Sequence, residues 1–313
     1  MRAIRIREPG DPDVLEVVER PAPTPGPGEV RIHVAAMGVN RADALQRRGV
    51  YPAPPGVAPD VPGLEVAGTI DAVGPNAEGR VGDRVMSLVA GGGYAEQVVV
   101  HGREAIPVPA GWSMPEAAAA LESYLTAFDA LFARGEARPG ERVLVHAVGS
   151  GVGIAVVQLA RAAGLTTYGT SRTPAKLDRA VALGLHHAVA VGAALPEVDV
   201  IVDLVGGPGV DASLRALAPR GRLVVVGLLA GLSATIPLGL LLSRRLRVEG
   251  TVLRSRPIEE KIALAQAFRA RGLPLLGDAR PVVDTVLPAT QAAEAHRRME
   301  ADASFGRIVL EWG

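Results

Sequence analysis

One stretch near the middle of the chain limits the possible folds more than any other, because it changes from strand-like to helix-like across a cluster of glycines. Residues 142–147 form a short apolar run with β-branched valines, which is typical of a strand buried on both faces. Residues 148–153 are rich in glycine, and residues 154–163 have the length and apolar content of a helix that ends at Gly164. The sequence therefore predicts a strand, a tight turn and a helix in succession.

A helix that begins at such a turn can bind an anion. Its first backbone N–H groups lack partners and its dipole is positive at that end, which favours a diphosphate. The turn departs from the dinucleotide fingerprint G-x-G-x-x-G, because Ser150 stands where the second glycine would fall. Two alternatives follow: a turn that binds nothing, or a dinucleotide-binding turn formed by Gly149, Ser150, Gly151, Val152 and Gly153.

The residues beyond this turn continue the alternation of strand and helix. Strands are predicted over residues 165–169, 198–205 and 222–227, and Thr173 with Pro174 predicts the start of a helix that ends near Gly184. This alternation predicts an α/β fold with a parallel, doubly wound sheet.

Ligands of such sheets bind at the carboxyl ends of the strands. Asp203 and Val205 end one predicted strand, and Gly227 and Leu228 end another. We expect these residues to line a cofactor cleft.

Charge indicates which dinucleotide binds. Proteins that bind NAD usually carry Asp or Glu about 20 residues beyond the glycine turn, whereas no acid lies between Gly153 and Asp178. Ser171, Arg172 and Lys176 offer a hydroxyl and two cations there, which suit a 2′-phosphate. The sequence therefore predicts NADPH rather than NADH. The alternative is that the two cations only solvate the start of an exposed helix.

Composition excludes several classes of protein. A chain of 313 residues can bury two cores, and 48% hydrophobic residues indicate a globular protein. The formal net charge is zero, and the basic residues form no patch interleaved with aromatics, which argues against nucleic acid as a partner. Charged side chains near Met1 replace the apolar core of a signal peptide, so we expect a cytoplasmic protein.

Residues 223–242 are twenty residues without a charge, which is long enough for a membrane helix. Gly227, Gly231, Ser233 and Pro237 interrupt the stretch, so we expect a strand, a turn and a short helix, with no membrane span. The excess apolar surface indicates contact with a second subunit.

The two ends of the chain have a different texture. Residues 1–115 contain short alternating strands, such as 29–34 and 65–73, broken by proline and glycine, which indicates a mostly β domain. Helices are predicted after Ser113 and over residues 124–134, 257–271 and 291–300, followed by a last strand over 307–311. We expect this tail to return to the first domain and complete it.

Motifs along nearly the whole chain resemble one family. They are Gly38-Val-Asn-Arg-Ala-Asp43, Arg48-Gly-Val-Tyr51, Pro62-Gly-Leu-Glu-Val-Ala-Gly-Thr-Ile-Asp-Ala-Val-Gly74, Val81-Gly-Asp-Arg-Val85, Leu125-Thr-Ala127, the glycine turn and Gly250-Thr-Val-Leu-Arg-Ser-Arg256. Together they resemble the zinc-independent quinone oxidoreductase branch of the medium-chain dehydrogenase/reductase family. The resemblance implies a GroES-like catalytic domain (residues 1–120 and 256–313) around a Rossmann domain (121–255), with NADPH as cofactor and a homodimer.

Departures from the zinc-containing relatives predict that no metal is bound. Their Gly-His-Glu motif is Gly63-Leu64-Glu65 here, and Asn40 stands where they have a ligand cysteine. Tetrahedral zinc needs thiolate, imidazole or carboxylate donors held together, yet the chain has no cysteine and its six histidines are scattered.

The resemblance also implies roles for single residues. Asn40 is expected to form a hydrogen bond near the nicotinamide or the substrate carbonyl, while Asp43 orders its loop. Tyr51 is the candidate to stack on the acceptor or to donate a proton, and its alternative is a tyrosine that only packs in a loop.

The resemblance also implies that further residues bind the cofactor. Thr126 is expected near the nicotinamide ribose or the diphosphate, and Leu253 and Arg254 are expected to flank the same cleft. Phe305 stands where relatives often place an asparagine near the cofactor.

The lack of zinc ligands restricts the chemistry. Hydride addition to a simple ketone leaves a localised alkoxide that a Lewis acid or a proton donor must stabilise, whereas a quinone or conjugated enone delocalises the charge itself. The sequence therefore predicts hydride transfer from NADPH to a quinone or another conjugated carbonyl compound. Two alternatives remain: a double-bond reductase that acts on alkenals or enones, and a non-catalytic NADPH-binding sensor or structural protein.

Overall fold

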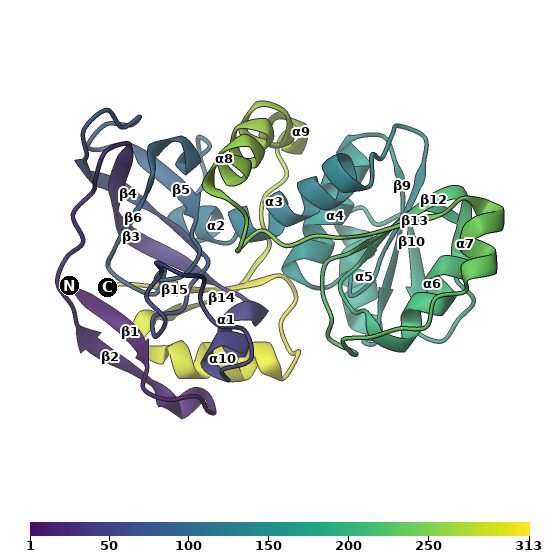
Figure 1. The fold of residues 1–313 in the computed structure, drawn as a ribbon, viewed down its shortest axis with the longest axis horizontal. Coiled ribbons are helices and arrows are strands. Elements are labelled where there is room, and N and C mark those ends of the chain that lie inside the picture. Colours follow the sequence, from purple (N-terminus) through teal and green to yellow (C-terminus); the bar gives the residue numbers. More distant parts are fainter. The chain divides into compact units, whose positions relative to one another are not determined.

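The computed structural model describes residues 1–313, which divide into two compact units. Unit 1 comprises Met1–Glu122, Arg254–Arg269 and Arg280–Gly313, and unit 2 comprises Ser123–Leu253 and Ala270–Ala279. Both chain ends therefore build unit 1, as Figure 1 shows. Ala270–Ala279 packs with unit 2, where α9 (Leu273–Leu276) contacts α4 (Gly151–Ala162), although its place in the sequence suggested the other domain.

Unit 2 contains a six-stranded, fully parallel sheet, which confirms the predicted doubly wound α/β fold. The strand order is β10-β9-β8-β11-β12-β13, so the order reverses between β8 and β11. Such a reversal is the usual ligand-binding position in open α/β sheets. The strands are β8 (Arg142–Val145), β9 (Thr166–Ser171), β10 (His187–Ala190), β11 (Val198–Asp203), β12 (Leu217–Val225) and β13 (Arg247–Gly250).

Helices flank the sheet of unit 2 (Figure 1). Besides α4 they are α3 (Leu121–Phe128), which continues as a π-helical turn over Asp129–Arg134, α5 (Pro174–Ala182), α6 (Val210–Ala216) and α7 (Leu238–Arg244). The uncharged run is divided as expected between β12 and α7. None of the helices combines the length and the apolar composition that a membrane crossing requires.

Unit 1 is built on a seven-stranded sheet of order β14-β15-β3-β4-β5-β7, with β6 paired to β3. The last strand of the chain pairs antiparallel with β3, Ile308 opposite Val39, so the tail completes the sheet begun by the N-terminal half. The strands are β3 (Glu29–Val39), β4 (Glu65–Val73), β5 (Arg84–Leu88), β6 (Gln97–His101), β7 (Ile106–Pro107), β14 (Val283–Pro288) and β15 (Arg307–Glu311); β1 (Arg2–Ile6) and β2 (Leu15–Glu19) form a separate hairpin.

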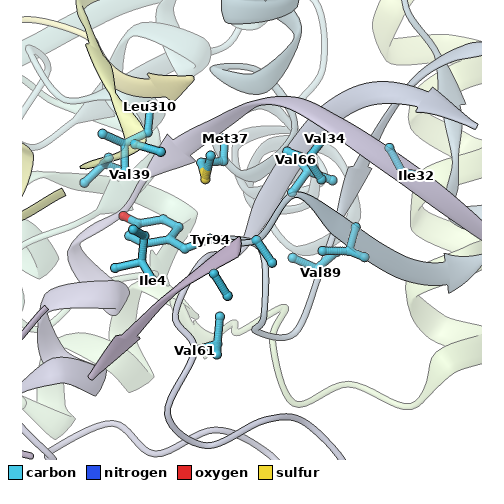
Figure 2. Packing of buried hydrophobic residues seen from close by; sticks show 14 of the residues in the cluster. Ile4, Ile32, Val34, Met37, Val39, Val61, Val66, Val89, Tyr94 and Leu310 are labelled. Carbon is cyan, nitrogen blue, oxygen red and sulfur yellow. The ribbon is translucent and has the colours of Figure 1, made fainter. Parts of the chain in front are cut away.

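The core of unit 1 explains why this sheet holds together. Figure 2 shows Tyr94 among apolar side chains from the hairpin and the sheet, including Ile4, Met37 and Leu310. Burying one such side chain fully contributes about 1.5–3 kcal/mol. Four helices complete the unit: α1 (Arg41–Arg47), α2 (Met114–Ala118), α8 (Ile258–Ala267) and α10 (Ala292–Glu300).

Candidate functional site

The glycine turn of unit 2 is shaped by a serine cap. Ser150 has extended backbone, and its Oγ accepts a hydrogen bond from the Gly153 N–H at 3.1 Å, so α4 begins at Gly151 and not at Ile154 as predicted. Such a cap stabilises a helix by about 1 kcal/mol. The departure from the glycine fingerprint at position 150 is therefore an N-cap signal, which sequence reasoning missed.

The turn leaves donors available to a ligand. The N–H groups of Gly151 and Val152, the first two residues of α4, have no acceptor within the chain. A Cβ at Gly153 would lie 2.6 Å from the Ala147 carbonyl oxygen, so only glycine permits this close passage of the backbone. A backbone that approaches closely, with free N–H groups at a helix start, fits a dinucleotide diphosphate.

The structure brings Lys176 to this turn. A Cβ on Gly149 would lie 2.9 Å from the Lys176 Cδ, so the lysine stem crosses the turn directly. Ser171 ends β9, which neighbours β8 in the sheet, and its Oγ accepts the Thr173 N–H at 3.1 Å. Arg172 follows Ser171, so the cationic segment begins at the same sheet edge as the glycine turn.

Asp203 shapes the loop at the end of β11. Its buried Oδ1 accepts hydrogen bonds from the N–H groups of Val205 at 2.8 Å and Gly206 at 3.0 Å. A Cβ at Gly227 would lie 2.5 Å from the Leu204 carbonyl oxygen, so the loops after β11 and β12 pass close together. The predicted residues 203, 205, 227 and 228 thus lie in adjoining strand-end loops, where the Asp203 carboxylate is occupied by backbone N–H groups.

In unit 1, the side chain of Asn40 has a defined orientation. Its Nδ2 donates to Glu65 Oε1 at 3.1 Å and to the Gly38 carbonyl oxygen at 3.4 Å. Both partners can only accept, since a carbonyl has no proton and the Glu65 carboxylate is paired with Arg307. The amide nitrogen therefore faces them, and the side-chain oxygen of Asn40 faces the Asp43 N–H in the capping box that begins α1.

Glu65 holds this arrangement from the start of β4. Besides its ion pair with Arg307, its Oε2 accepts the Glu122 N–H at 2.9 Å, and the side chain is fully buried. A Cβ at Gly38 would lie 2.2 Å from Glu65 Oε1, so the glycine leaves room for the carboxylate. Burial raises the pKa of the neighbouring Glu122 to about 7.

Asp43 organises the loop before α1, as the family resemblance implied. Its carboxylate accepts hydrogen bonds from the N–H groups of Asn40 at 2.8 Å and Gly63 at 2.9 Å, and from the Tyr94 hydroxyl at 3.2 Å. Burial raises the pKa of Asp43 to about 6, against the lowering effect of these donors. The Tyr94 hydroxyl lies 3.2 Å from His296 Nε2, which extends the buried network to α10.

Tyr51 lies beside a buried cation. The Arg254 Cζ is 5.0 Å from the centroid of the Tyr51 ring, and Arg254 Nη1 donates to the Tyr51 carbonyl oxygen at 3.1 Å. The Tyr51 hydroxyl makes no hydrogen bond within the chain. Burial raises the pKa of Tyr51, while Arg254 opposes that shift.

The other predicted cofactor residues are buried. Thr126 lies in α3, Leu253 ends the main segment of unit 2, and Phe305 precedes β15, with its N–H donated to Asp284 at 3.0 Å. Their contact with a cofactor stays a prediction.

The residues present do not fit a zinc ion. No group of three or more His, Cys, Asp or Glu side chains is placed to hold a metal. Asn40 and Leu64 occupy the positions where the family pattern has ligands, and an amide that donates to Glu65 is already occupied. No catalytic step can be derived through zinc here.

Known protein families match parts of both units. Residues 26–110 match the family described as alcohol dehydrogenase GroES-like domain, and residues 151–269 match the family described as zinc-binding dehydrogenase. A quinone oxidoreductase of Lama guanicoe is 32% identical over 325 residues, which cover 99% of this chain and 97% of that protein. The human synaptic vesicle membrane protein VAT-1 homolog is 32% identical over 332 residues, which cover 96% of this chain and 84% of that protein.

Solved structures agree in fold. The quinone oxidoreductase from Thermus thermophilus, solved alone and in complex with NADPH, superposes with a TM-score of 0.84 at 37% identity over 99% of this chain and 100% of that one. A mycobacterial protein in complex with NADPH superposes with a TM-score of 0.87 at 30% identity over 99% of this chain and 100% of that one. This chain therefore belongs to the medium-chain dehydrogenase/reductase family, in its quinone oxidoreductase branch, and is an oxidoreductase with a GroES-like domain and a domain for a nicotinamide cofactor.

Proposed function

We propose that this protein transfers hydride from NADPH to a quinone or another conjugated carbonyl compound without a metal ion. The observation that carries the proposal lies in unit 1: Asn40 and Leu64 stand where zinc-dependent relatives have metal ligands, so the polar groups offered there are the amide of Asn40 and the phenol of Tyr51. An acceptor that delocalises the incoming charge needs mainly correct placement beside the nicotinamide.

The preference for NADPH rests on charge. Lys176 crosses the glycine turn, Arg172 directly follows β9, and no acid lies between Gly153 and Asp178 to bind a ribose 2′-hydroxyl. Two similar structures contain NADPH, which agrees with the proposal. A Michaelis constant for NADH at or below that for NADPH would refute it.

The reaction divides the work between the cofactor and the chain. NADPH supplies the hydride. The Asn40 amide nitrogen already donates to Glu65 and Gly38, and its side-chain oxygen has a second lone pair beside the one used in the capping box, so we propose that this oxygen accepts a hydrogen bond from a hydroxyl or amide of the nicotinamide half and that Asn40 does not donate to the substrate carbonyl. Tyr51 stacks on the acceptor or donates a proton to it.

A donor-acceptor exchange tests the orientation of Asn40. Asn40→Asp should weaken NADPH binding at least tenfold, because two carboxylates then face each other. Adding Glu65→Gln restores a donor toward position 40 at unchanged total charge and should recover most of the affinity, measured by calorimetry on protein shown to be folded by circular dichroism, because this change also removes the counterion of Arg307. If Asn40 instead donates to the ligand, the double variant will not recover.

Anaerobic NADPH oxidation tests the function itself. We expect turnover with a quinone or an enal and none without an acceptor. Turnover with enals alone would favour the double-bond reductase, and no turnover across a broad panel of acceptors would favour a non-catalytic module. Tyr51→Phe with full turnover on both classes of acceptor would exclude proton donation by Tyr51.

We also propose a homodimer that forms through unit 2. A set of apolar side chains is exposed around α7 and the edge strand β13: Leu228, Leu229, Leu232, Ile236, Leu238, Leu242 and Val248. Exposed apolar patches of this kind usually mark an interface. Sedimentation should show a dimer that Leu232→Asp with Leu242→Asp converts to a monomer, while Val181→Asp on α5 leaves it intact. The cytoplasmic location stays a prediction.

A further inference from the structure

Arg254 differs from the other buried arginines of unit 1. Arg47 is paired with Glu300, and Arg307 is paired with Glu65. Arg254 is only 6% exposed, yet it forms no ion pair. Burying a cation without a counterion is costly, and burial lowers the pKa of Arg254 accordingly.

Neutral acceptors hold the Arg254 side chain in place. Its Nε donates to the Ala90 carbonyl oxygen at 2.7 Å, its Nη1 to the Tyr51 carbonyl oxygen at 3.1 Å, and its Nη2 to Gln46 Oε1. Gln46 in turn donates from Nε2 to the Pro59 carbonyl oxygen at 2.9 Å. The Arg254 guanidinium therefore binds the backbone at residues 51 and 90 directly. Through Gln46, near the end of α1, it is also connected to the backbone at residue 59.

The uncompensated charge lies over the ring of Tyr51, and the hydroxyl of that ring has no partner in the chain. A cation close to a phenol favours the phenolate and so makes the phenol a stronger acid. Glu122 is the other charged group that acts on Tyr51, in the opposite direction, and Asp43 acts on Arg254. Of these three charged groups only Arg254 is a cation, so only Arg254 favours the phenolate of Tyr51.

We propose that Arg254 is a positioning residue that fixes Tyr51 and strengthens its hydroxyl as a proton donor toward the anionic oxygen of the reduced acceptor. Hydride from NADPH adds to a carbon of the conjugated system, and an electron pair moves onto the carbonyl oxygen. The Tyr51 O–H gives its proton to that oxygen, and solvent reprotonates the phenolate. The catalytic part rests on the proposed function, whereas the effect of Arg254 on the phenol does not.

The acidity of Tyr51 can be measured without turnover. Biosynthetic incorporation of 3,5-difluorotyrosine brings phenol ionisation toward neutral pH, and ¹⁹F NMR follows each of the four tyrosines, with Tyr51→Phe assigning its resonance. Arg254→Met should raise the Tyr51 pKa by about one unit, a tenfold loss in acidity. Arg254→Lys retains the charge and should keep most of the original value.

Arg254→Gln, which keeps a donor toward the loop carbonyls, replaces Arg254→Met if that variant does not fold by circular dichroism. An unchanged Tyr51 titration in a folded neutral variant overturns the proposal. In turnover, Arg254→Met should lower kcat about tenfold with little change in the KM for NADPH, and should add nothing in a Tyr51→Phe background. A shifted titration in a protein that reduces no conjugated carbonyl would leave the effect on Tyr51 standing and refute the proposed function instead.

Discussion

The two units present their functional groups in different ways. In unit 2, the candidate cofactor site consists largely of backbone: residues 149–153 form a turn in which Ser150 caps a helix and glycine allows close approach. In unit 1, the candidate site consists of side chains from distant parts of the chain, such as Asn40, Glu65 and Arg307. A backbone site can therefore be encoded locally, whereas a site of buried polar side chains depends on partners that only folding assembles.

Breaking the buried ion pair of unit 1 should have the largest effect. Arg307→Met leaves the Glu65 carboxylate buried without its counterion, and such a change destabilises by about 3–5 kcal/mol. Urea unfolding measures the loss. The control Arg298→Met removes an exposed pair with Glu294 on α10 and should cost less than about 0.5 kcal/mol. Equal losses of unfolding free energy in the two variants would show that the buried ion pair contributes no more to stability than the exposed one.

The second test disturbs the backbone site of unit 2. Gly153→Ala places a Cβ 2.6 Å from the Ala147 carbonyl oxygen and 2.7 Å from the Val148 Cα, so the turn must shift. We expect a loss of about 1–3 kcal/mol in stability and weaker NADPH binding by fluorescence titration. Gly239→Ala on α7, where a Cβ meets nothing within 4 Å, should lose neither. Unchanged NADPH affinity in Gly153→Ala would argue against this turn as the diphosphate site.

The third test concerns Glu104, a buried carboxylate that is not paired with an arginine. Glu104 is 8% exposed, and burial raises its pKa to about 7 from 4.5. The folded state therefore disfavours the ionised form, so the free energy of unfolding should fall as pH rises from about 4.5 to about 7, by on the order of 2–3 kcal/mol.

Glu104→Gln should reduce this pH dependence, to which the raised pKa values of Asp43 and Glu122 also contribute, and should be more stable than the wild type at pH 8. Chemical unfolding at several pH values measures it. The same slope in both proteins would show that Glu104 is not the group that titrates. Lys261 is the charged neighbour that opposes the rise in the Glu104 pKa.

The smallest expected effect concerns Lys176, the cation beside the glycine turn. Lys176→Met should weaken NADPH binding about tenfold, which corresponds to about 1.4 kcal/mol, and leave NADH binding nearly unchanged. Calorimetry with both cofactors measures the difference, with Arg269→Met in unit 1 as the control. An equal loss for both cofactors would place Lys176 at the diphosphate and not at the 2′-phosphate.

Much of the fold could be predicted, because periodicity and capping are local signals. Strands β4 and β15 have the predicted bounds, and the capping box at Ser113 is present. The start of α4 was wrong, because Ser150 was interpreted as a missing glycine and not as an N-cap. The packing of Ala270–Ala279 with unit 2 was also unforeseen, since nothing in a short segment shows which core it will join.

The candidate site was only partly predictable. Asn40, Tyr51 and Arg254 were identified by resemblance, but not their partners. No spacing pattern connects Asn40 with Glu65, or Arg254 with Gln46, because these pairs meet only after β3 and β4 align and after the chain returns from unit 2.

The sequence alone determined the alternation of strands and helices, the glycine turn and the lack of a zinc ligand set, because each depends on residue type and short-range spacing. Tertiary structure decided which way the Asn40 amide faces, and left Arg254 buried over Tyr51 with no carboxylate. These features arise from burial and from contacts between distant residues, and the strength of a charge in a protein depends on what surrounds it.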